Sequence, residues 1–122
     1  MKALFDTNIL IDYLNGVPEA GKELDLYEVR SASIVTWMEV MCGGDAALDD
    51  ATRSFLNRFT IIPIDNAIAE RAVTLRRQQR RLKLPDAIIL ATSMESGLML
   101  VTRNTKDFTK ALPGVRHPYV LQ

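Results

Sequence analysis

The sequence predicts an α/β fold with three layers, α/β/α, in which helices cover both faces of a central, mostly parallel sheet of about four to five strands. Short apolar runs alternate with longer amphipathic segments along the whole chain. Parallel strands need crossover connections, which are usually helices, so this alternation favours a parallel sheet. With 122 residues and no internal repeat or linker, residues 1–122 are expected to form a single domain.

The N-terminal third is expected to contain two strands and two short helices. An apolar run stops at Asp6, and Thr7 and Asn8 follow with side chains that favour a helix start. Pro18 suits the first turn of a second helix. The expected elements are, in order, a strand at 3–5, a helix at 9–14, a helix from 18 to about 27 and a strand at 29–35.

The remaining two thirds continue the alternation. Pro63 favours an edge position for its strand, and Pro85 and Gly97 mark the start and end of a helix. The expected elements are a helix from Thr36 interrupted by Gly43–Gly44, a helix at 46–59, a strand at 61–64, a helix from 65 or 66 to about 82, a helix at 85–97, a strand at 98–102, a short helix at 105–110 and a last strand at 115–121.

Acidic and amide side chains fall where strands end or helices begin. They are Asp6 after the first strand, Glu39 one turn into the helix after the second, Asp86 in the first turn of a helix, and Asn104 and Asp107 after the fourth strand. Ligands of an open parallel sheet bind beyond the carboxyl ends of its strands, so these side chains should approach one crevice. Neighbouring carboxylates repel by about 1 kcal/mol per pair, and a hard divalent cation with oxygen ligands would offset this.

Each of these residues also has a purely structural interpretation. Thr36-x-x-Glu39 matches a capping box, in which Glu39 would bond only to the backbone. Asp86 and Asp107 are favoured at any helix start by the helix dipole, and Asp6 could cap the helix that follows it. A carboxylate directly after a core strand is nevertheless poorly solvated and needs a partner.

Four sequence blocks together resemble the PIN-domain family, and within it the small VapC- and FitB-type toxins. The resemblance covers essentially the whole chain, and the order and spacing of the blocks make it specific. The blocks are FDTNIL at 5–10, TWME at 36–39, LPDAIILAT at 84–92 and LVTRNTKDF at 100–108.

The resemblance implies a three-layer fold, Mg²⁺- or Mn²⁺-dependent cleavage of RNA with a 5′-phosphate product, a homodimer and inhibition by a small DNA-binding antitoxin. The family's core carboxylates match Asp6, Glu39 and Asp86. Asn104 stands where many members have an aspartate, so Asp107 is the candidate for the remaining charge. One bound metal and two bound metals both stay open.

We therefore expect a metal-dependent endoribonuclease, the toxin of a type II toxin–antitoxin pair. The expected catalytic residues are Asp6, Glu39, Asp86 and Asp107, the metal ligands Asp6, Asp86, Glu39 and Asn104, and the residues that orient them Thr7, Asn8 and Thr102. One alternative is a PIN-fold binding module with weak or no catalysis. Another is an aspartyl-phosphate phosphatase, although that chemistry needs an acid two residues after the nucleophile, where Asn8 stands.

A basic stretch is the second candidate surface. Its residues, expected on one long helix, are Arg71, Arg76, Arg77, Arg80, Arg81 and Lys83. It either faces water or contacts RNA phosphates or an antitoxin, with Arg76, Arg77, Arg80 and Arg81 paired at i,i+4 spacing. The chain has 15 basic and 15 acidic residues, so any nucleic-acid contact must be local.

Composition bounds the location of the protein. Cys42 is the only cysteine, which excludes an internal disulfide, and we expect it to be buried. Asp6 and Asp12 interrupt the N-terminal segment where a signal peptide needs an apolar run, and no stretch approaches the ~20 apolar residues of a membrane span. The sequence therefore predicts an unprocessed cytoplasmic protein without a membrane segment.

Overall fold

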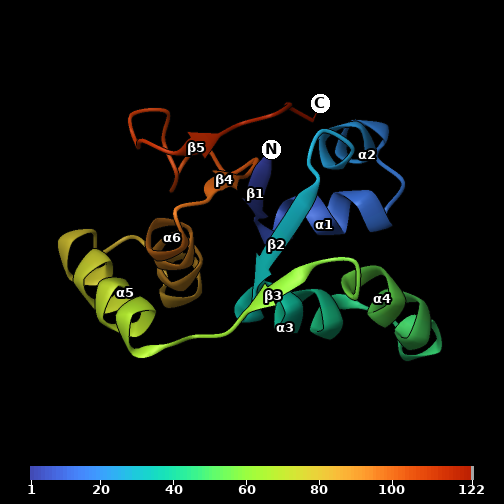
Figure 1. Cartoon of the computed structure of the whole chain (residues 1–122), viewed down its shortest axis with the longest axis horizontal. Helices are drawn as coiled ribbons and strands as arrows, with labels where there is room; N and C mark the ends of the chain where they lie inside the picture. Colours follow the sequence, from blue (N-terminus) through green and yellow to red (C-terminus); the bar gives the residue numbers. More distant parts are fainter. Residues whose placement is uncertain (122) are drawn as a thin grey trace.

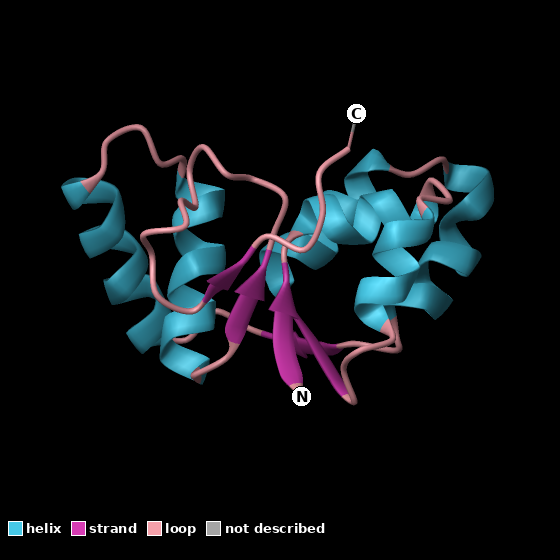
Figure 2. Cartoon of the chain, turned by 90° about the horizontal axis from the view of Figure 1, so that it is seen from above, coloured by secondary structure: helices cyan, strands magenta, loops and turns pink. Residues whose placement is uncertain are grey.

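Five parallel strands form the central sheet of the computed structural model, which describes residues 1–121 (Figures 1 and 2). The strands are β1 (Lys2–Phe5), β2 (Val29–Ser33), β3 (Thr60–Ile62), β4 (Met99–Val101) and β5 (Val115–Arg116). Their order is β3-β2-β1-β4-β5, and every neighbouring pair is parallel. This confirms the predicted parallel sheet and places β1 at its centre.

The central strand separates two apolar cores. Ala3 and Phe5 belong to the core on one face of β1, whereas Leu4 between them belongs to the other, as the two-residue period of a strand requires. All three residues are fully buried. This burial on both sides explains why the first strand is a continuous apolar run.

Helices cover both faces of the sheet, as the three-layer prediction required (Figure 2). On the face of Phe5 pack α1 (Thr7–Leu14), α2 (Pro18–Leu24), α3 (Ile34–Gly43) and α4 (Asp49–Leu56), with the short 3-10 helix η1 (Ala46–Leu48) before α4. On the face of Leu4 pack α5 (Asn66–Gln78) and α6 (Leu84–Ser96). Within residues 1–121, no helix combines the length and apolarity that a membrane crossing needs.

The helix after the second strand begins earlier than predicted. Ser33 ends β2 and caps α3, its hydroxyl oxygen accepting a hydrogen bond from the backbone N–H of Val35 at 3.1 Å. Thr36 is therefore the third helical residue, not the first. The capping box expected between Thr36 and Glu39 is wrong, because the Ser33 hydroxyl already fills the capping position.

Several other predicted boundaries are also wrong. The predicted helix at 46–59 divides into η1 and α4, and α5 stops at Gln78. Residues 105–110 form turns instead of a helix, and the last strand contains only Val115 and Arg116. β3 does lie at an edge of the sheet, as Pro63 predicted. Cys42 is exposed near the end of α3.

Candidate active site

Asp6 occupies the carboxyl end of the central strand and is only 4% exposed. Its Oδ1 accepts a hydrogen bond from the backbone N–H of Thr7 at 2.8 Å, which makes it the cap of α1. Its Oδ2 accepts from the hydroxyl of Thr102 at 2.7 Å and from the side-chain amide of Asn8 at 3.2 Å. All three donors are neutral, so this buried carboxylate has no cationic partner among them.

The surroundings of Asp6 disfavour its charge. Burial, the largest cause, together with the nearby negative charges of Asp86 and Glu39, raises its pKa from 3.8 to about 6. The hydrogen bonds from Thr102 and Thr7 act in the opposite direction without cancelling this effect. Asp6 is therefore a carboxylate that a nearby cation would stabilise.

Glu39 reaches the same region from α3. Thr7 Oγ1 lies 2.7 Å from Glu39 Oε1 and 3.0 Å from the hydroxyl oxygen of the fully buried Thr36. Since a hydroxyl carries a single proton, Thr7 donates to the carboxylate and accepts from Thr36. Glu39 itself is exposed, and its position is set by this side-chain bond between α1 and α3.

Asp86 lies in the first turn of α6 and is half-buried. Burial is the main cause that raises its pKa, followed by the negative charges of Asp107 and Glu39, whereas Lys83 lowers it. The four predicted acids, Asp6, Glu39, Asp86 and Asp107, thus influence one another at one edge of the sheet. The predicted convergence of these residues is consistent with this geometry.

Asn104 and Asp107 lie in the loop after β4. The Asn104 side-chain oxygen accepts hydrogen bonds from the backbone N–H groups of Lys106 at 3.2 Å and Asp107 at 3.0 Å. The Asn104 amide nitrogen donates to Asp107 Oδ2 at 3.0 Å. Both acceptor positions of the Asn104 oxygen are occupied, so this arrangement orients Asp107 and does not offer the Asn104 oxygen to a metal.

Thr7, Asn8 and Thr102, the residues predicted to orient the metal ligands, each form a side-chain hydrogen bond with an acid of the site. Thr102 is fully buried, donates to Asp6 and accepts a hydrogen bond from the Asn104 backbone N–H at 3.0 Å. Asn8 donates to both Asp6 and Thr102. Within residues 1–121, no three His, Cys, Asp or Glu side chains stand in an arrangement that could hold a metal ion. The acids are close enough to repel one another but are not drawn together as a ligand set.

The sequence predicted that the basic residues lie on one long helix, and this prediction is wrong. Because α5 ends at Gln78, Arg80 and Arg81 lie in the loop that leads into α6. Arg76 donates to the carbonyl oxygen of Arg80 at 2.8 Å and so holds this loop against the helix. Arg71 instead forms an ion pair with Glu95.

Positive charge gathers at the end of α5 and in the loop that follows it. Arg76, Arg77 and Arg80 line one open hollow with Leu84, two residues before Asp86. In the described part of the chain, none of Arg76, Arg77, Arg80 and Arg81 forms an ion pair with an acidic side chain. This positive charge is uncompensated within the chain.

A buried ion pair beside the site was not predicted from the sequence. Arg103 binds Asp12 through two contacts, Nε to Oδ2 at 2.5 Å and Nη2 to Oδ1 at 2.9 Å, and the Tyr119 hydroxyl donates to Oδ2 at 2.8 Å. Asp12 is only 5% exposed. The sequence did contain a signal for it, because Asp12 lies within the apolar segment 9–14 and a buried carboxylate there needs a cationic partner.

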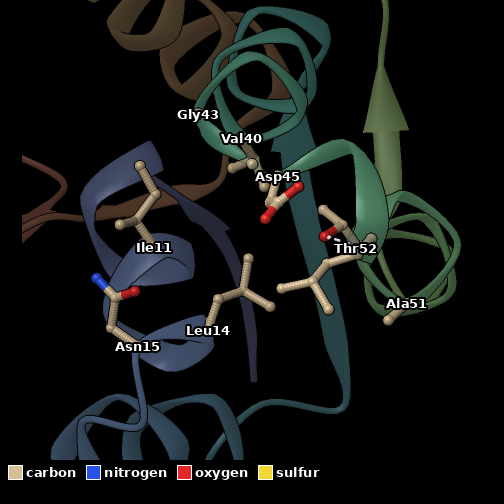
Figure 3. A pocket seen from close by; sticks show the side chains of 10 residues that line it. Ile11, Leu14, Asn15, Val40, Gly43, Asp45, Ala51 and Thr52 are labelled. Atoms are coloured by element: carbon tan, nitrogen blue, oxygen red, sulfur yellow. Dashed lines mark hydrogen bonds between the residues drawn. The ribbon is translucent and has the colours of Figure 1, made fainter.

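One pocket lies apart from these acids. It has a volume of about 300 Å³ and lies between α1, α3 and α4, where Ile11, Leu14, Val40 and Thr52 are among its lining residues (Figure 3). Asp45 is its one acidic lining residue. None of the four predicted catalytic acids lines it.

Acidic side chains beyond the carboxyl ends of a parallel sheet, with helices on both faces, define a class of α/β proteins with a ligand site at the sheet edge. Residues 3–111 match the family model described as PIN domain. The chain belongs to the PIN-domain family, whose toxin members are generally nucleases.

Comparison with solved structures finds similar chains in toxin–antitoxin complexes. A chain of a toxin–antitoxin complex from Klebsiella pneumoniae is 50% identical, with a TM-score of 0.91, over 98% of this chain and 99% of that one. A chain of FitAB bound to a DNA fragment is 25% identical, with a TM-score of 0.81, over 100% of this chain and 98% of that one.

A chain of VapBC2 from Rickettsia felis bound to a promoter DNA fragment shares the fold. It has a TM-score of 0.76 at 22% identity, over 94% of this chain and 96% of that one. Among curated proteins, no significant match is found.

Proposed function

We propose that this chain is a Mg²⁺- or Mn²⁺-dependent endoribonuclease and the toxin of a type II toxin–antitoxin pair. The observation that carries the nuclease proposal is the buried Asp6. Neutral donors and negative neighbours surround it, and its pKa is raised to about 6. A divalent cation would relieve this repulsion, and it is also a catalyst that can promote phosphodiester hydrolysis.

In the proposal Asp6, Glu39 and Asp86 would hold the cation once their side chains draw together, since in the described residues they are not arranged as a ligand set. Carboxylate oxygens are the donors that Mg²⁺ and Mn²⁺ prefer, so the donor set fits the ion. When bound, the cation supplies a water molecule of lowered pKa and stabilises negative charge on the scissile phosphate. Asp107 contributes a fourth charge and Asn104 orients it, because the Asn104 oxygen is engaged by backbone N–H groups.

The neutral partners keep the acids in place. Thr102 and Asn8 hold Oδ2 of Asp6, while Thr7 holds Oε1 of Glu39. Oδ1 of Asp6 accepts from the Thr7 backbone and keeps a second lone pair. In the proposal this oxygen would help to hold the cation. The phosphatase alternative is disfavoured because Asn8, which is not an acid, donates to Asp6 at the position where that chemistry needs one.

The arginine loop is the proposed contact for RNA phosphates. Arg76, Arg77, Arg80 and Arg81 form no ion pair with an acidic side chain in the described residues, and three of them line a hollow with Leu84, two residues before Asp86. In the proposal they would hold the phosphates of a strand that crosses the acidic edge. The measurement is the salt dependence of RNA affinity. Arg80→Gln should reduce the slope by about one if the Arg80 side chain neutralises one phosphate, and an unchanged slope would remove Arg80 from the interface.

The proposed partner is a small DNA-binding antitoxin. Support comes from the chain of a toxin–antitoxin complex that is 50% identical to this one. It also comes from the similar chains of FitAB and VapBC2, which were solved in complexes bound to DNA fragments. A homodimer and a cytoplasmic location belong to the same proposal. Co-expression with the product of a small neighbouring gene tests the pairing, since a cognate antitoxin should copurify and suppress cleavage.

The decisive experiment is cleavage of single-stranded RNA with Mg²⁺ or Mn²⁺, with and without a chelator. Asp86→Asn should lower the rate roughly a thousandfold or more, because it removes several kcal/mol of transition-state stabilisation. Asp50→Asn is the matched control, since Asp50 also lies in a first helical turn, in α4, and is exposed. Metal-independent cleavage would contradict the proposal, and partner binding without cleavage would favour the binding-module alternative.

A further inference from the structure

Two ion-pair networks attach the C-terminal segment to the N-terminal helices. Each contains a buried acid, an arginine that binds both oxygens of the acid, and a tyrosine hydroxyl. The site clamp consists of Asp12 in α1, Arg103 and Tyr119. The remote clamp consists of Glu23 in α2, Arg116 in β5 and Tyr27.

The two clamps have nearly the same geometry. In the remote clamp, Arg116 Nε and Nη2 lie 2.7 and 2.9 Å from the two Glu23 oxygens, and the Tyr27 hydroxyl lies 2.7 Å from Oε2. Asp12 and Glu23 are each 5% exposed. Figure 1 shows the segment after β5 running back toward α2, on the side of the sheet where both clamps lie. The chain therefore contains two ion-pair networks with the same three kinds of side chain.

Only the site clamp is hydrogen-bonded to Asn8, whose side chain reaches the acidic cluster. The backbone N–H of Arg103 donates to Asn8 Oδ1 at 3.1 Å, and this bond sets which way the Asn8 amide points. The Asn8 nitrogen then donates to Asp6 Oδ2 at 3.2 Å and to Thr102 at 3.3 Å. Arg116 reaches the region through its carbonyl oxygen, which accepts from the Thr102 backbone N–H at 3.0 Å and so joins two strands of the sheet without contacting Asn8.

Apart from the contacts of Arg103, the side-chain hydrogen bonds of residues 103–107 stay within the segment from Thr102 to Phe108. Its residues form turns, and the nearest buried apolar anchors are Val101 before it and Phe108 after it. Segments with few apolar contacts and no regular hydrogen bonding open most readily. The bidentate Arg103–Asp12 interaction is thus the side-chain anchor at the start of the loop that carries Asn104 and Asp107.

We propose that Asp12 and Arg103 are positioning residues for cleavage. Their ion pair holds the Arg103 backbone against Asn8, and this fixes the hydrogen bonds that orient Asp6 and the following loop. The inference rests on the proposed nuclease function. Neither residue touches the substrate or the cation, so their replacement affects turnover through the placement of Asp6, Asn104 and Asp107.

Steady-state kinetics of Arg103→Lys and Arg116→Lys test the proposal. Both substitutions keep the charge but cannot form the two-point interaction, so both should lower the melting temperature by similar amounts. Arg103→Lys should also lower kcat about 10- to 100-fold with KM for RNA unchanged within about twofold, as for residues that support a site. Equal kcat for the two variants would overturn the proposal. A rise in KM alone would also overturn it, because Arg103 would then be a direct RNA contact.

A double-mutant cycle shows whether Asp12 and Arg103 act as one unit. Asp12→Asn should reproduce the decrease in kcat, and the double variant should lose little more than either single variant. Decreases that multiply would mean independent roles and would overturn the clamp. If Asp12→Asn does not fold, Tyr119→Phe provides the milder variant, which removes only the third hydrogen bond to Asp12 and should lower kcat by a smaller factor.

Hydrogen exchange provides a readout that does not depend on cleavage. The Arg103 and Asn104 backbone N–H groups bond to Asn8 and Thr102, so they should exchange about tenfold or more faster in Arg103→Lys than in Arg116→Lys. Unchanged exchange overturns the proposal even if the enzyme is active. If the wild type does not cleave RNA while exchange changes as expected, the nuclease proposal fails and the clamp's ordering of the loop stands.

Discussion

Asp6 and Glu23 are both buried acids, but their partners differ completely. Glu23 is 5% exposed and binds Arg116 through two contacts and Tyr27 through a third. Although burial raises the pKa of Glu23, the hydrogen bonds from Arg116 and Tyr27 hold it below its usual value. Asp6, 4% exposed, receives bonds only from neutral groups, and its pKa is raised to about 6.

The difference separates an acid that the chain pairs with a positive charge from one that it leaves unpaired, and the proposed function assigns the chemistry to the second. The positive charge that Glu23 needs is supplied by the chain itself. For Asp6 the chain supplies Asp86 and Glu39, which add to the repulsion. A buried charge without a charged partner is costly, and its presence at a ligand edge of the sheet is typical of functional sites. Substitutions at the two kinds of acid should therefore change stability by different amounts, from the largest at Glu23 to the smallest at Glu39.

Glu23→Gln should give the largest loss of stability. It breaks a buried ion pair, and we expect a cost of about 3 kcal/mol, at the lower end for such pairs because Arg116 is partly exposed. Cleavage should stay within about twofold of the wild type. Urea unfolding at pH 7 measures the first quantity and the RNA assay the second. A stable but inactive variant would reverse the contrast between Glu23 and Asp6.

Addition of Mg²⁺ or Mn²⁺ should stabilise the wild type. Binding to the folded state alone adds about 2.7 kcal/mol at a metal concentration ~100-fold above Kd. Thermal melting of a chelator-stripped sample measures the effect. Glu23→Gln should retain the whole increment, whereas Asp86→Asn should lose most of it. A melting temperature that does not respond to millimolar metal would count strongly against a cation site.

Asp6→Asn should stabilise the metal-free protein at neutral pH. Since one pH unit of pKa displacement corresponds to about 1.4 kcal/mol, a rise from 3.8 to about 6 implies about 3 kcal/mol. We expect a net gain of about 2 kcal/mol, because the amide cannot keep every hydrogen bond that the carboxylate accepts.

The stability gained by Asp6→Asn should increase as the pH rises. Between about pH 4 and 6 the folded chain retains a proton on Asp6 that the unfolded chain has released, so the wild type loses stability as the pH rises through this window. The advantage of Asp6→Asn should therefore be complete above pH 6 and vanish near pH 4. Urea unfolding at pH 4, 5, 6 and 7 checks this, and a constant difference would refute the raised pKa.

Glu39→Gln should have the smallest effect on stability and a large one on cleavage. Glu39 is exposed and is not part of a capping box, so the change should cost less than about 0.5 kcal/mol. Loss of a charged ligand should still lower metal-dependent cleavage by about tenfold or more. Thermal melting without metal and the RNA assay measure the two effects. Near-normal cleavage would leave Asp6 and Asp86 as the core acids.

The elements that were predicted well are those with local signals in the sequence. The buried run before Asp6 indicated the central strand, Pro18 and Gly97 marked helix ends, and β3 lies at the edge that Pro63 indicated. Errors arose where two local signals competed. The sequence pattern favoured Thr36 as the start of the helix, whereas in the structure Ser33 caps α3 and the fully buried Thr36 lies 3.0 Å from the Thr7 hydroxyl of α1.

Local sequence patterns were sufficient to predict the order of strands and helices and the positions of Asp6, Glu39 and Asp86 along them, because periodicity and element ends are encoded by neighbouring residues. Which side chains bind one another was fixed only by tertiary packing. Arg103 and Asp12 are 91 residues apart, and the Asn104 oxygen is occupied by backbone N–H groups that no pattern predicted. A buried acid must have a partner, but which distant side chain reaches it depends on how the helices and the last strand pack, and no local pattern contains that information.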